Sequence, residues 1–211
     1  MSAASPEGPA FPGIAVPKAG RALRGLGETL TTTSATGSAS LSLPIPLTPG
    51  RAGAPLDLRL SYDSSAGNGP FGLGWQLSSP AITRKTDKGL PTYTDADVFV
   101  LRGGEELVPR RRADGALDAR VWNAFRIQRY APRVESTFSR VERWTHGGTG
   151  ETHWRVITRD NVLSIFGRTA QARIANPRDP TQVFSWLIEE TRDDRGDALR
   201  YAYRGEDGAG V

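Results

Sequence analysis

The chain has 211 residues, of which 37% are hydrophobic, and its 24 glycines and 15 prolines favour many short strands and turns over long helices. The sequence contains no cysteine, so disulfides and thiolate metal sites are excluded. The net charge is +4, but 23 acidic residues are interspersed among 27 basic ones, which argues against a nucleic-acid-binding surface. No stretch reaches the roughly 20 apolar residues that a membrane helix needs, so direct membrane insertion is not expected.

The N-terminal residues predict an arm rather than a folded element. Residues 1–35 are rich in small residues, proline and glycine, and we expect them to be disordered or draped over the surface. The first ten residues have neither a basic start nor an apolar centre, so we do not expect a secretory signal peptide there. We expect a β domain over residues 36–205 and a short tail over residues 206–211. Because the sequence stops directly after the last predicted strand, we interpret it as a fragment of a longer protein.

From Gly37 onward, the sequence predicts one strand after another. In the first strand Ala39, Leu41 and Leu43 alternate with serines, which is the period of a half-buried strand. Further strands are expected over residues 55–62, 74–78, 80–85, 97–102, 105–109, 119–131, 138–145, 152–159, 162–167, 182–192 and 198–204. The predicted fold class is therefore all-β and antiparallel, with stacked hairpins that form a curved sheet.

A glycine-rich loop interrupts the alternation after the strand that ends at Tyr62. Four glycines and a proline force the chain into a compact irregular path, because glycine alone adopts positive φ without strain. We expect Phe71 and Trp75 to clamp this loop onto the sheet. The structural motif comprises Tyr62, Asp63, Gly67, Asn68, Gly69, Pro70, Gly72, Gly74 and Trp75. A dinucleotide-binding role for these glycines is not favoured, because no helix is predicted after them.

Two hairpins are predicted towards the C-terminal end. One runs from Trp154 to Phe166 around Asp160-Asn161, and the other runs from Phe184 to Tyr203 around residues 194–197. In the second hairpin, period-2 alternation places three apolar side chains on one face of the return strand: Leu199, Tyr201 and Tyr203. The tryptophans fall on predicted strands, so packing in a core or on a sheet face is favoured over stacking on sugars. They are Trp75, Trp122, Trp144, Trp154 and Trp186.

The histidines and serines do not form a recognisable metal or catalytic site. His146 and His153 flank a turn with Glu151 nearby, but a convincing third ligand is missing. Ser64 and Ser65 lack a histidine at the spacing of a catalytic triad. We therefore expect no catalytic residue, no cofactor and no metal.

The charged and glycine-rich runs outside the loop also favour structural roles. Glu189 and Glu190 are adjacent on a predicted strand, so their side chains are expected on opposite faces and cannot act as a pair. Arg110-Arg111-Arg112 precedes a polar turn and is interpreted as a solvated loop. The run from Gly20 to Gly27 lacks the preceding strand and the lysine of a phosphate-binding loop.

Several segments resemble the opening domain of the toxin complex TcB component and of the related Salmonella plasmid virulence protein SpvB. The strongest match runs from Leu60 to Tyr93 and includes Leu-Ser-Tyr-Asp, Gly-Asn-Gly-Pro-Phe-Gly and Arg-Lys-Thr-Asp-Lys-Gly-Leu-Pro. Further matches precede it at 17–28 and 36–51 and follow it at 97–101, 106–109, 130–144, 153–155, 160–161, 166–170 and 184–190. The segment from Asp194 to Tyr203 resembles one Rhs/YD repeat, in which Asp197 stands where asparagine is usual. The resemblance covers most of the chain.

The resemblance implies a non-enzymatic, structural role. In this family the segment belongs to TcB, which joins a TcC component in a hollow Rhs-type β-shell around an unfolded cytotoxic polypeptide. The implied partners are a TcC-like (Rhs) component and the enclosed toxin polypeptide, with a TcA-like translocation pore contacted through downstream regions. The implied location is extracellular, after synthesis in the bacterial cytoplasm and export by a route other than the general secretory one.

The sequence is also compatible with two other functions. The segment could be the carrier or secretion module of a virulence protein whose ADP-ribosyltransferase domain lies downstream, as in the Salmonella relative. The Ser-Thr-Ser strand and Glu-x-Glu pair of such transferases do not occur in this sequence. The segment could also be an adhesion or polymorphic-toxin module that acts in bacterial competition.

Overall fold

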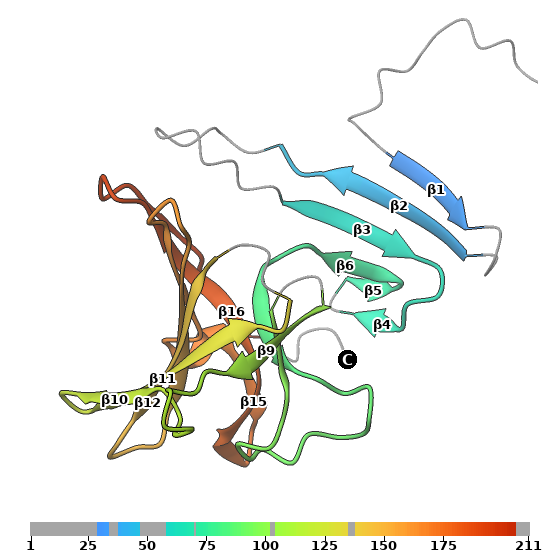
Figure 1. Cartoon of the computed structure of the whole chain (residues 1–211). Coiled ribbons are helices and arrows are strands. Elements are labelled where there is room, and N and C mark those ends of the chain that lie inside the picture. The colour runs from blue at the N-terminus through green and yellow to red at the C-terminus, as the bar shows by residue number, and fades with distance from the viewer. Residues whose placement is uncertain are drawn as a thin grey trace, which may run out of the picture.

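The computed structural model describes residues 29–33, 38–46, 58–69, 71–101, 104–134 and 138–205. Throughout these ranges the fold is all-β and antiparallel, as the sequence predicts (Figure 1). The elements are β1 (Thr29–Thr33), β2 (Ser38–Pro44), β3 (Arg59–Asp63), β4 (Asn68–Gly69), β5 (Gly72–Leu73), β6 (Trp75–Leu77), β7 (Ala81–Arg84), β8 (Phe99–Leu101), β9 (Glu105–Pro109), β10 (Ala119–Trp122), β11 (Phe125–Pro132), β12 (Arg140–His146), β13 (Thr152–Ile157), β14 (Leu163–Phe166), the short 3-10 helix η2 (Ala170–Ala172), β15 (Arg173–Asn176), β16 (Asp179–Arg192) and β17 (Ala198–Arg200).

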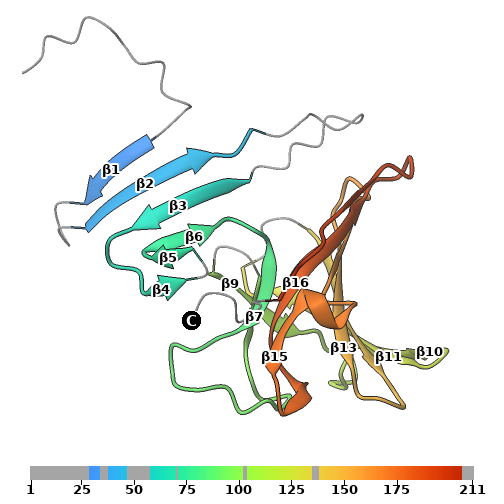
Figure 2. The same cartoon turned by 180° about the vertical axis from the view of Figure 1, so that it is seen from behind.

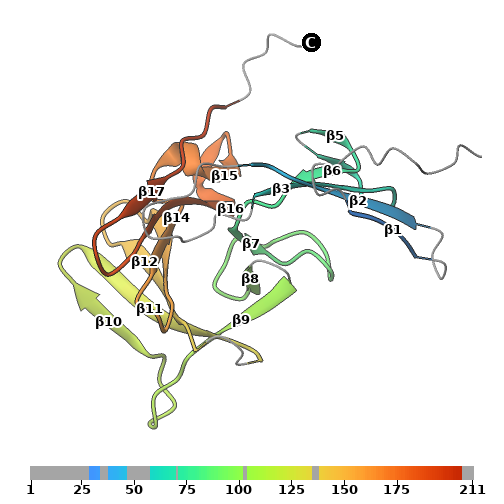
Figure 3. The same cartoon turned by 90° about the horizontal axis from the view of Figure 1, so that it is seen from above.

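Eight strands close into a barrel, in the order β11-β12-β13-β14-β16-β7-β8-β9 and back to β11. The closing contact pairs Leu107 of β9 with Pro132 of β11, and Figure 3 shows the strands following one another around a ring. The sequence predicts a curved antiparallel sheet, but its local patterns do not predict closure. Closure removes two open edges from the sheet, because each terminal strand becomes the other's neighbour.

Aromatic side chains fill the interior of the barrel. Phe99 lies at the centre, with its ring centroid 4.9 Å from that of Trp154, 5.8 Å from that of Trp186 and 5.9 Å from that of Tyr130. All four side chains are buried. Each fully buried aromatic ring contributes about 2–3 kcal/mol to folding through removal of apolar surface from water. The prediction that the tryptophans pack in a core or on a sheet face is confirmed for Trp154 and Trp186, whereas Trp122 is 54% exposed.

A second sheet, β1-β2-β3-β6, lies beside the barrel (Figures 1 and 2). Its register places Leu41, Tyr62 and Trp75 on one face and serines on the other. Strand β1 falls within the residues for which the sequence predicts an irregular arm. Its threonines are β-branched and favour a strand when β2 provides pairing partners. The prediction of an irregular arm considered composition alone and missed this pairing. The remainder of the predicted arm, and the predicted tail over 206–211, lie outside the described residues.

Two further differences concern strand boundaries. The strand predicted over residues 119–131 is two strands, β10 and β11, joined by a tight turn in which Asn123 takes a left-handed φ of 49°. Strand β15 is not predicted, because its four residues gain their partners only from the long β16. β16 pairs with four strands, namely β14 and β15 and also β7 and β17.

The two predicted C-terminal hairpins are present. The first turns at Asn161, which has a φ of 60°. In the second, Asp193 accepts hydrogen bonds from the backbone N–H of Arg195 and of Asp197 across the turn. The return strand ends at Arg200, earlier than predicted, and Leu199 is exposed. The two tyrosines that follow contact the barrel: Tyr201 packs against the core, and the Tyr203 hydroxyl donates to the carbonyl of Ile188 at 2.7 Å.

Candidate functional site: the glycine loop and the arginine-lined barrel end

The glycine loop is a compact connection between β3 and β6, as predicted. Within it β4 and β5 form a small hairpin in which Gly69 pairs with Gly72. Gly72 and Gly74 have φ values of 97° and 78°, in the region that favours glycine, whereas Gly67 does not need positive φ. Asn68 lies on β4, and Pro70 lies outside the described residues.

Gly74 is the most constrained position of this loop. Its N–H donates to the carbonyl of Gly67 at 3.0 Å, and its carbonyl accepts from the N–H of Asp63 at 2.9 Å. A Cβ at this position would lie 2.6 Å from Cε2 of Tyr62. The Tyr62 ring also contacts Trp75, with a centroid separation of 5.2 Å. The loop is therefore built so that its backbone passes directly over an aromatic ring.

The expected clamp on this loop is correct for only one of its two aromatic residues. Trp75 is half-buried against Tyr62, but Phe71 is 53% exposed and does not hold the loop on the sheet. Asp63 instead orders the start of the loop, because its carboxylate accepts from both the N–H and the hydroxyl of Ser65. These two hydrogen bonds lower the pKa of Asp63.

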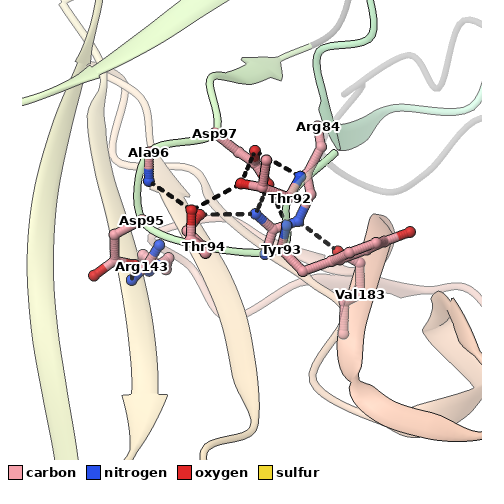
Figure 4. Close-up of polar contacts among 9 residues, drawn as sticks. All are labelled: Arg84, Thr92, Tyr93, Thr94, Asp95, Ala96, Asp97, Arg143 and Val183. Atoms are coloured by element: carbon pink, nitrogen blue, oxygen red, sulfur yellow. Dashed lines mark hydrogen bonds and ion pairs between the residues drawn. The ribbon is translucent and has the colours of Figure 1, made fainter. Parts of the chain in front are cut away.

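A second candidate site lies at one end of the barrel, where the loop between β7 and β8 contacts Arg84 and Arg143 of the barrel strands (Figure 4). Asp97 organises this loop. Its carboxylate accepts from the N–H and hydroxyl of Thr92, at 3.0 and 2.8 Å, and from the N–H of Tyr93 at 2.8 Å. Burial opposes ionisation of Asp97, but these donors and Arg84 outweigh it and lower its pKa. Tyr93 takes a positive φ of 58°, so the loop is held in an uncommon conformation.

Arg84 attaches the loop to the barrel. It projects from β7 into the interior and is 8% exposed. Its Nε donates to the carbonyl of Val183 at 2.8 Å, and its Nη1 donates to Asp97 at 2.7 Å and to the carbonyl of Thr94 at 3.2 Å. The guanidinium also lies 5.0 Å from the ring centroid of Phe99, which compensates part of its desolvation. Burial lowers the pKa of Arg84, and Asp97 opposes this shift.

Arg143 is the second buried arginine at this end. It projects from β12 and lies 5.6 Å from the ring centroid of Phe99. Its Nη2 donates to Asp95 in the loop, and this hydrogen bond lowers the pKa of Asp95. A cavity of about 320 Å³ opens here, and its lining includes both buried arginines together with Arg126 and Asp95. No local sequence pattern predicts this site, although the spacing Ile82-x-Arg84 places Arg84 on the same strand face as a core residue.

The two histidines lie on the outer face of the barrel and are separated by a ring. Phe125 contacts both His146, at 5.2 Å between centroids, and His153, at 5.6 Å. Burial, with a contribution from Arg155, lowers the pKa of His153 to about 3. Within the described ranges no group of three or more metal-ligating side chains is present, and no helix there is long and apolar enough to span a membrane.

The prediction for the two adjacent glutamates is wrong in one respect. Strand β16 is irregular opposite the step from Ile165 to Phe166, and the extra residue is Glu189. This bulge lets both carboxylates reach one side chain, since Arg168 lies 3.9 Å from Glu189 and 3.5 Å from Glu190. Glu190 also pairs with Arg192 and Arg200, so the group is an ion-pair network. In the arginine run before the turn at residues 114–115, Arg110–Arg112 are exposed, in agreement with a solvated loop.

Comparison with known proteins matches this fold to one family. The family model described as "SpvB: Salmonella virulence plasmid 65kDa B protein" matches residues 33–211. The chain is 35% identical over 205 residues to the mono(ADP-ribosyl)transferase SpvB of Salmonella typhimurium, and the same identity is found with that of Salmonella dublin. The match covers 93% of this chain and 33% of the relative, so the chain spans about a third of the length of these curated proteins.

Solved structures of toxin complex proteins and of SpvB also match the chain. The crystal structure of TcdB2-TccC3 matches with a TM-score of 0.77 at 38% identity, over 95% of this chain and 10% of that one. The Photorhabdus luminescens Tc holotoxin pore matches with a TM-score of 0.77 at 38% identity, over 96% of this chain and 10% of that one. The N-terminal domain of the effector SpvB from Salmonella typhimurium LT2 matches with a TM-score of 0.73 at 35% identity, over 81% of this chain and 56% of that one.

Proposed function

The chain belongs to the SpvB family, and from this premise we propose that it is a non-enzymatic structural segment of a toxin complex B component. In this role the chain forms part of the wall of a β-shell that encloses a cytotoxic polypeptide for delivery. The observation that carries the proposal is the match of 95% of the chain, at 38% identity, to one tenth of a TcdB2-TccC3 chain. A segment that keeps its whole fold within so large an assembly acts as a building unit of that assembly.

The interior of the barrel supports a structural role. The space that an enzyme would use for a substrate is filled by aromatic side chains such as Phe99 and Trp154. At the barrel end, Arg84 and Asp97 bind each other and neighbouring backbone groups, so these two side chains hold the loop. The described residues hold no group of three or more metal-ligating side chains, and the Thr149 hydroxyl, which lies 3.1 Å from Nδ1 of His146, sits in an exposed turn outside the cavity.

The proposed partners follow from the same relatives. They are a TcC-like component, the enclosed polypeptide and, through downstream regions, a TcA-like pore. We also propose that the protein acts as part of a secreted toxin or effector, as these relatives do.

A chimera tests the structural role directly. The corresponding segment of TcdB2 is replaced by this chain, and the product is combined with TccC3 and viewed by electron microscopy. We expect closed particles like those of the parent complex. A chimera that is soluble and folded but forms no closed complex would refute the proposal.

A second candidate function is supported by the curated relatives. They are named mono(ADP-ribosyl)transferases, and this chain aligns with a third of their length. The chain would then be a carrier module for a transferase domain in the same polypeptide. We expect the chain of 211 residues to leave actin unmodified when incubated with NAD; ADP-ribosylated actin would show that the non-enzymatic assignment is wrong.

A further inference from the structure

The barrel end carries more positive charge than its own carboxylates satisfy. Three arginines line the cavity, namely Arg84, Arg126 and Arg143, and two carboxylates of the loop face them. Asp97 is fully engaged with Arg84 and with the loop backbone. Among the described residues that line the cavity, only the carboxylate of Asp95 therefore remains to pair with Arg126 and Arg143.

Arg143 is only partly satisfied by Asp95. Its side chain is 7% exposed, and its Nη2 donates to Oδ1 of Asp95. Its Nε is buried and makes no hydrogen bond within the described residues. In a guanidinium group Nε–H and Nη2–H form one edge whose two donors match the two oxygens of a carboxylate. Asp95 uses one donor of this edge and leaves the other without an acceptor, so the edge is suited to a second, better-placed carboxylate.

Asp95 itself is held weakly. Its side chain is 70% exposed, and the hydrogen bond to Arg143 is the one contact by which its carboxylate is fixed among the described residues. It occupies a turn in which the N–H of Asp97 donates to the carbonyl of Thr94 at 3.3 Å, a long hydrogen bond. An exposed side chain on such a turn can rotate into solvent without disturbing the Asp97 contacts that fix the loop.

Arg126 supplies a second cation at the entrance. It lies two residues before Gln128 on β11, and Gln128 is paired with Arg143, so Arg126 faces the same side of the sheet one step nearer the solvent. The Arg126 side chain is exposed, and its guanidinium makes no hydrogen bond or ion pair within the described ranges. Its cross-strand neighbour Thr145 also lines the cavity. The entrance of the cavity therefore holds the unpaired guanidinium of Arg126 beside that of Arg143, which has one free donor on the edge facing Asp95.

We propose that this end of the barrel is a carboxylate-binding site, in which an incoming carboxylate replaces Asp95 on Arg143 and also contacts Arg126. The ligand accepts from Nε and Nη2 of Arg143 together, a bidentate arrangement that Asp95 does not make. Asp95 is thus an internal competitor that occupies the site until the ligand arrives. Two sources carry this chemistry, an acidic side chain of an extended polypeptide and a small free carboxylate.

The test uses the whole chain and follows the Arg143 Nε–H signal by nitrogen-15 NMR at low ionic strength, where screening is weak. The probes are sodium acetate and the blocked tripeptide acetyl-Gly-Asp-Gly-amide, with inorganic phosphate as a third anion. We expect saturable shifts with both carboxylates. Asp95→Asn should tighten binding by about tenfold, since it removes the internal competitor, and Arg126→Gln should weaken it by about tenfold, the effect of one charge-assisted hydrogen bond.

Control variants keep the test decisive. Arg195→Gln changes an exposed arginine in the turn after β16, at the end of that strand opposite to the cavity residue Thr181, and should leave binding unaltered. Both Asp95 and Arg126 are exposed, so their variants are expected to fold even if replacement of the buried Arg143 does not. Tighter binding of the peptide than of acetate assigns the site to a polypeptide, and equal binding assigns it to small carboxylates. Absence of saturable binding to Asp95→Asn, an unchanged affinity in Arg126→Gln, or tighter binding of phosphate than of either carboxylate would overturn the proposal.

Discussion

Replacing Gly74 with alanine tests whether the glycine loop is a fold element. Two costs act on this variant. The backbone has a φ of 78°, and holding an alanine in the left-handed region costs about 1–2 kcal/mol. The new Cβ would also lie 2.6 Å from Cε2 of Tyr62 and 2.8 Å from the carbonyl oxygen of Asp63. Overpacking of this kind costs about 1–3 kcal/mol, because a backbone oxygen cannot move aside as a flexible side chain can.

The expected loss is therefore about 2–5 kcal/mol, the sum of these two costs. Gly72→Ala is the matched control, because its φ of 97° imposes the backbone cost while no atom lies within 4 Å of the added Cβ. It should lose about 1 kcal/mol, since the alanine also restricts the unfolded chain. Gly67→Ala carries neither cost and should be neutral or slightly stabilising.

Urea unfolding followed by tryptophan fluorescence gives the free energy of unfolding for each variant. Hydrogen exchange of the peptide segment over residues 58–78 reports on the second sheet separately from the barrel. The Asp63 N–H, which donates to the Gly74 carbonyl, should lose protection in Gly74→Ala. If Gly74→Ala were no more destabilising than Gly72→Ala, the argument that close packing over Tyr62 constrains this loop would be wrong.

Three further predictions concern the barrel. Gly167→Ala adds a Cβ 2.9 Å from Cβ of the buried Trp186 at a φ of 63°, so it should lower the free energy of unfolding by at least about 2 kcal/mol in urea. Its control is Gly150→Ala, which has a φ of 72° and no neighbour within 4 Å and should lower this free energy by only about 1 kcal/mol. Trp154→Ala empties the centre of the core and should cost about 3–5 kcal/mol by the same measurement; a loss below about 1 kcal/mol would contradict the central position of this ring. His153 has a pKa of about 3 in the folded protein and 6.5 in the unfolded chain, so between these pH values the unfolded chain binds a proton that the folded protein does not. The free energy of unfolding should therefore be highest above pH 6.5 and fall as the pH drops towards 3. His153→Gln should flatten this dependence between pH 5 and 7, above the range in which the carboxylates titrate; an unchanged slope of unfolding free energy against pH would show that His153 is not its source.

Much of the fold is readable from local patterns. The alternation of Ala39, Leu41 and Leu43 predicts a strand because side chains on a strand alternate between its two faces. The hairpin around Asn161 is predictable because asparagine tolerates the left-handed conformation that its turn requires. The need for glycine at positions 72 and 74 has the same origin, since both lie at positive φ. These features depend on a few neighbouring residues, and a sequence carries that information directly.

Other features depend on which strands meet, and local patterns do not determine this. Closure of the barrel requires Leu107 to pair with Pro132, and the residues around neither position predict that pairing. Alternation predicts that Glu189 and Glu190 point apart, yet a bulge that forms only against β14 brings both to Arg168.

The barrel-end site arises from tertiary contacts in the same way. Arg84 and Arg143 come from strands far apart in the sequence and converge because both face the interior of a closed sheet. The sequence by itself determined the strands, the turns and the glycine positions, because each is set by the steric and packing preferences of adjacent residues. The tertiary structure alone decided the closed barrel and its arginine-lined end, because long-range pairing places side chains together that share no pattern along the chain.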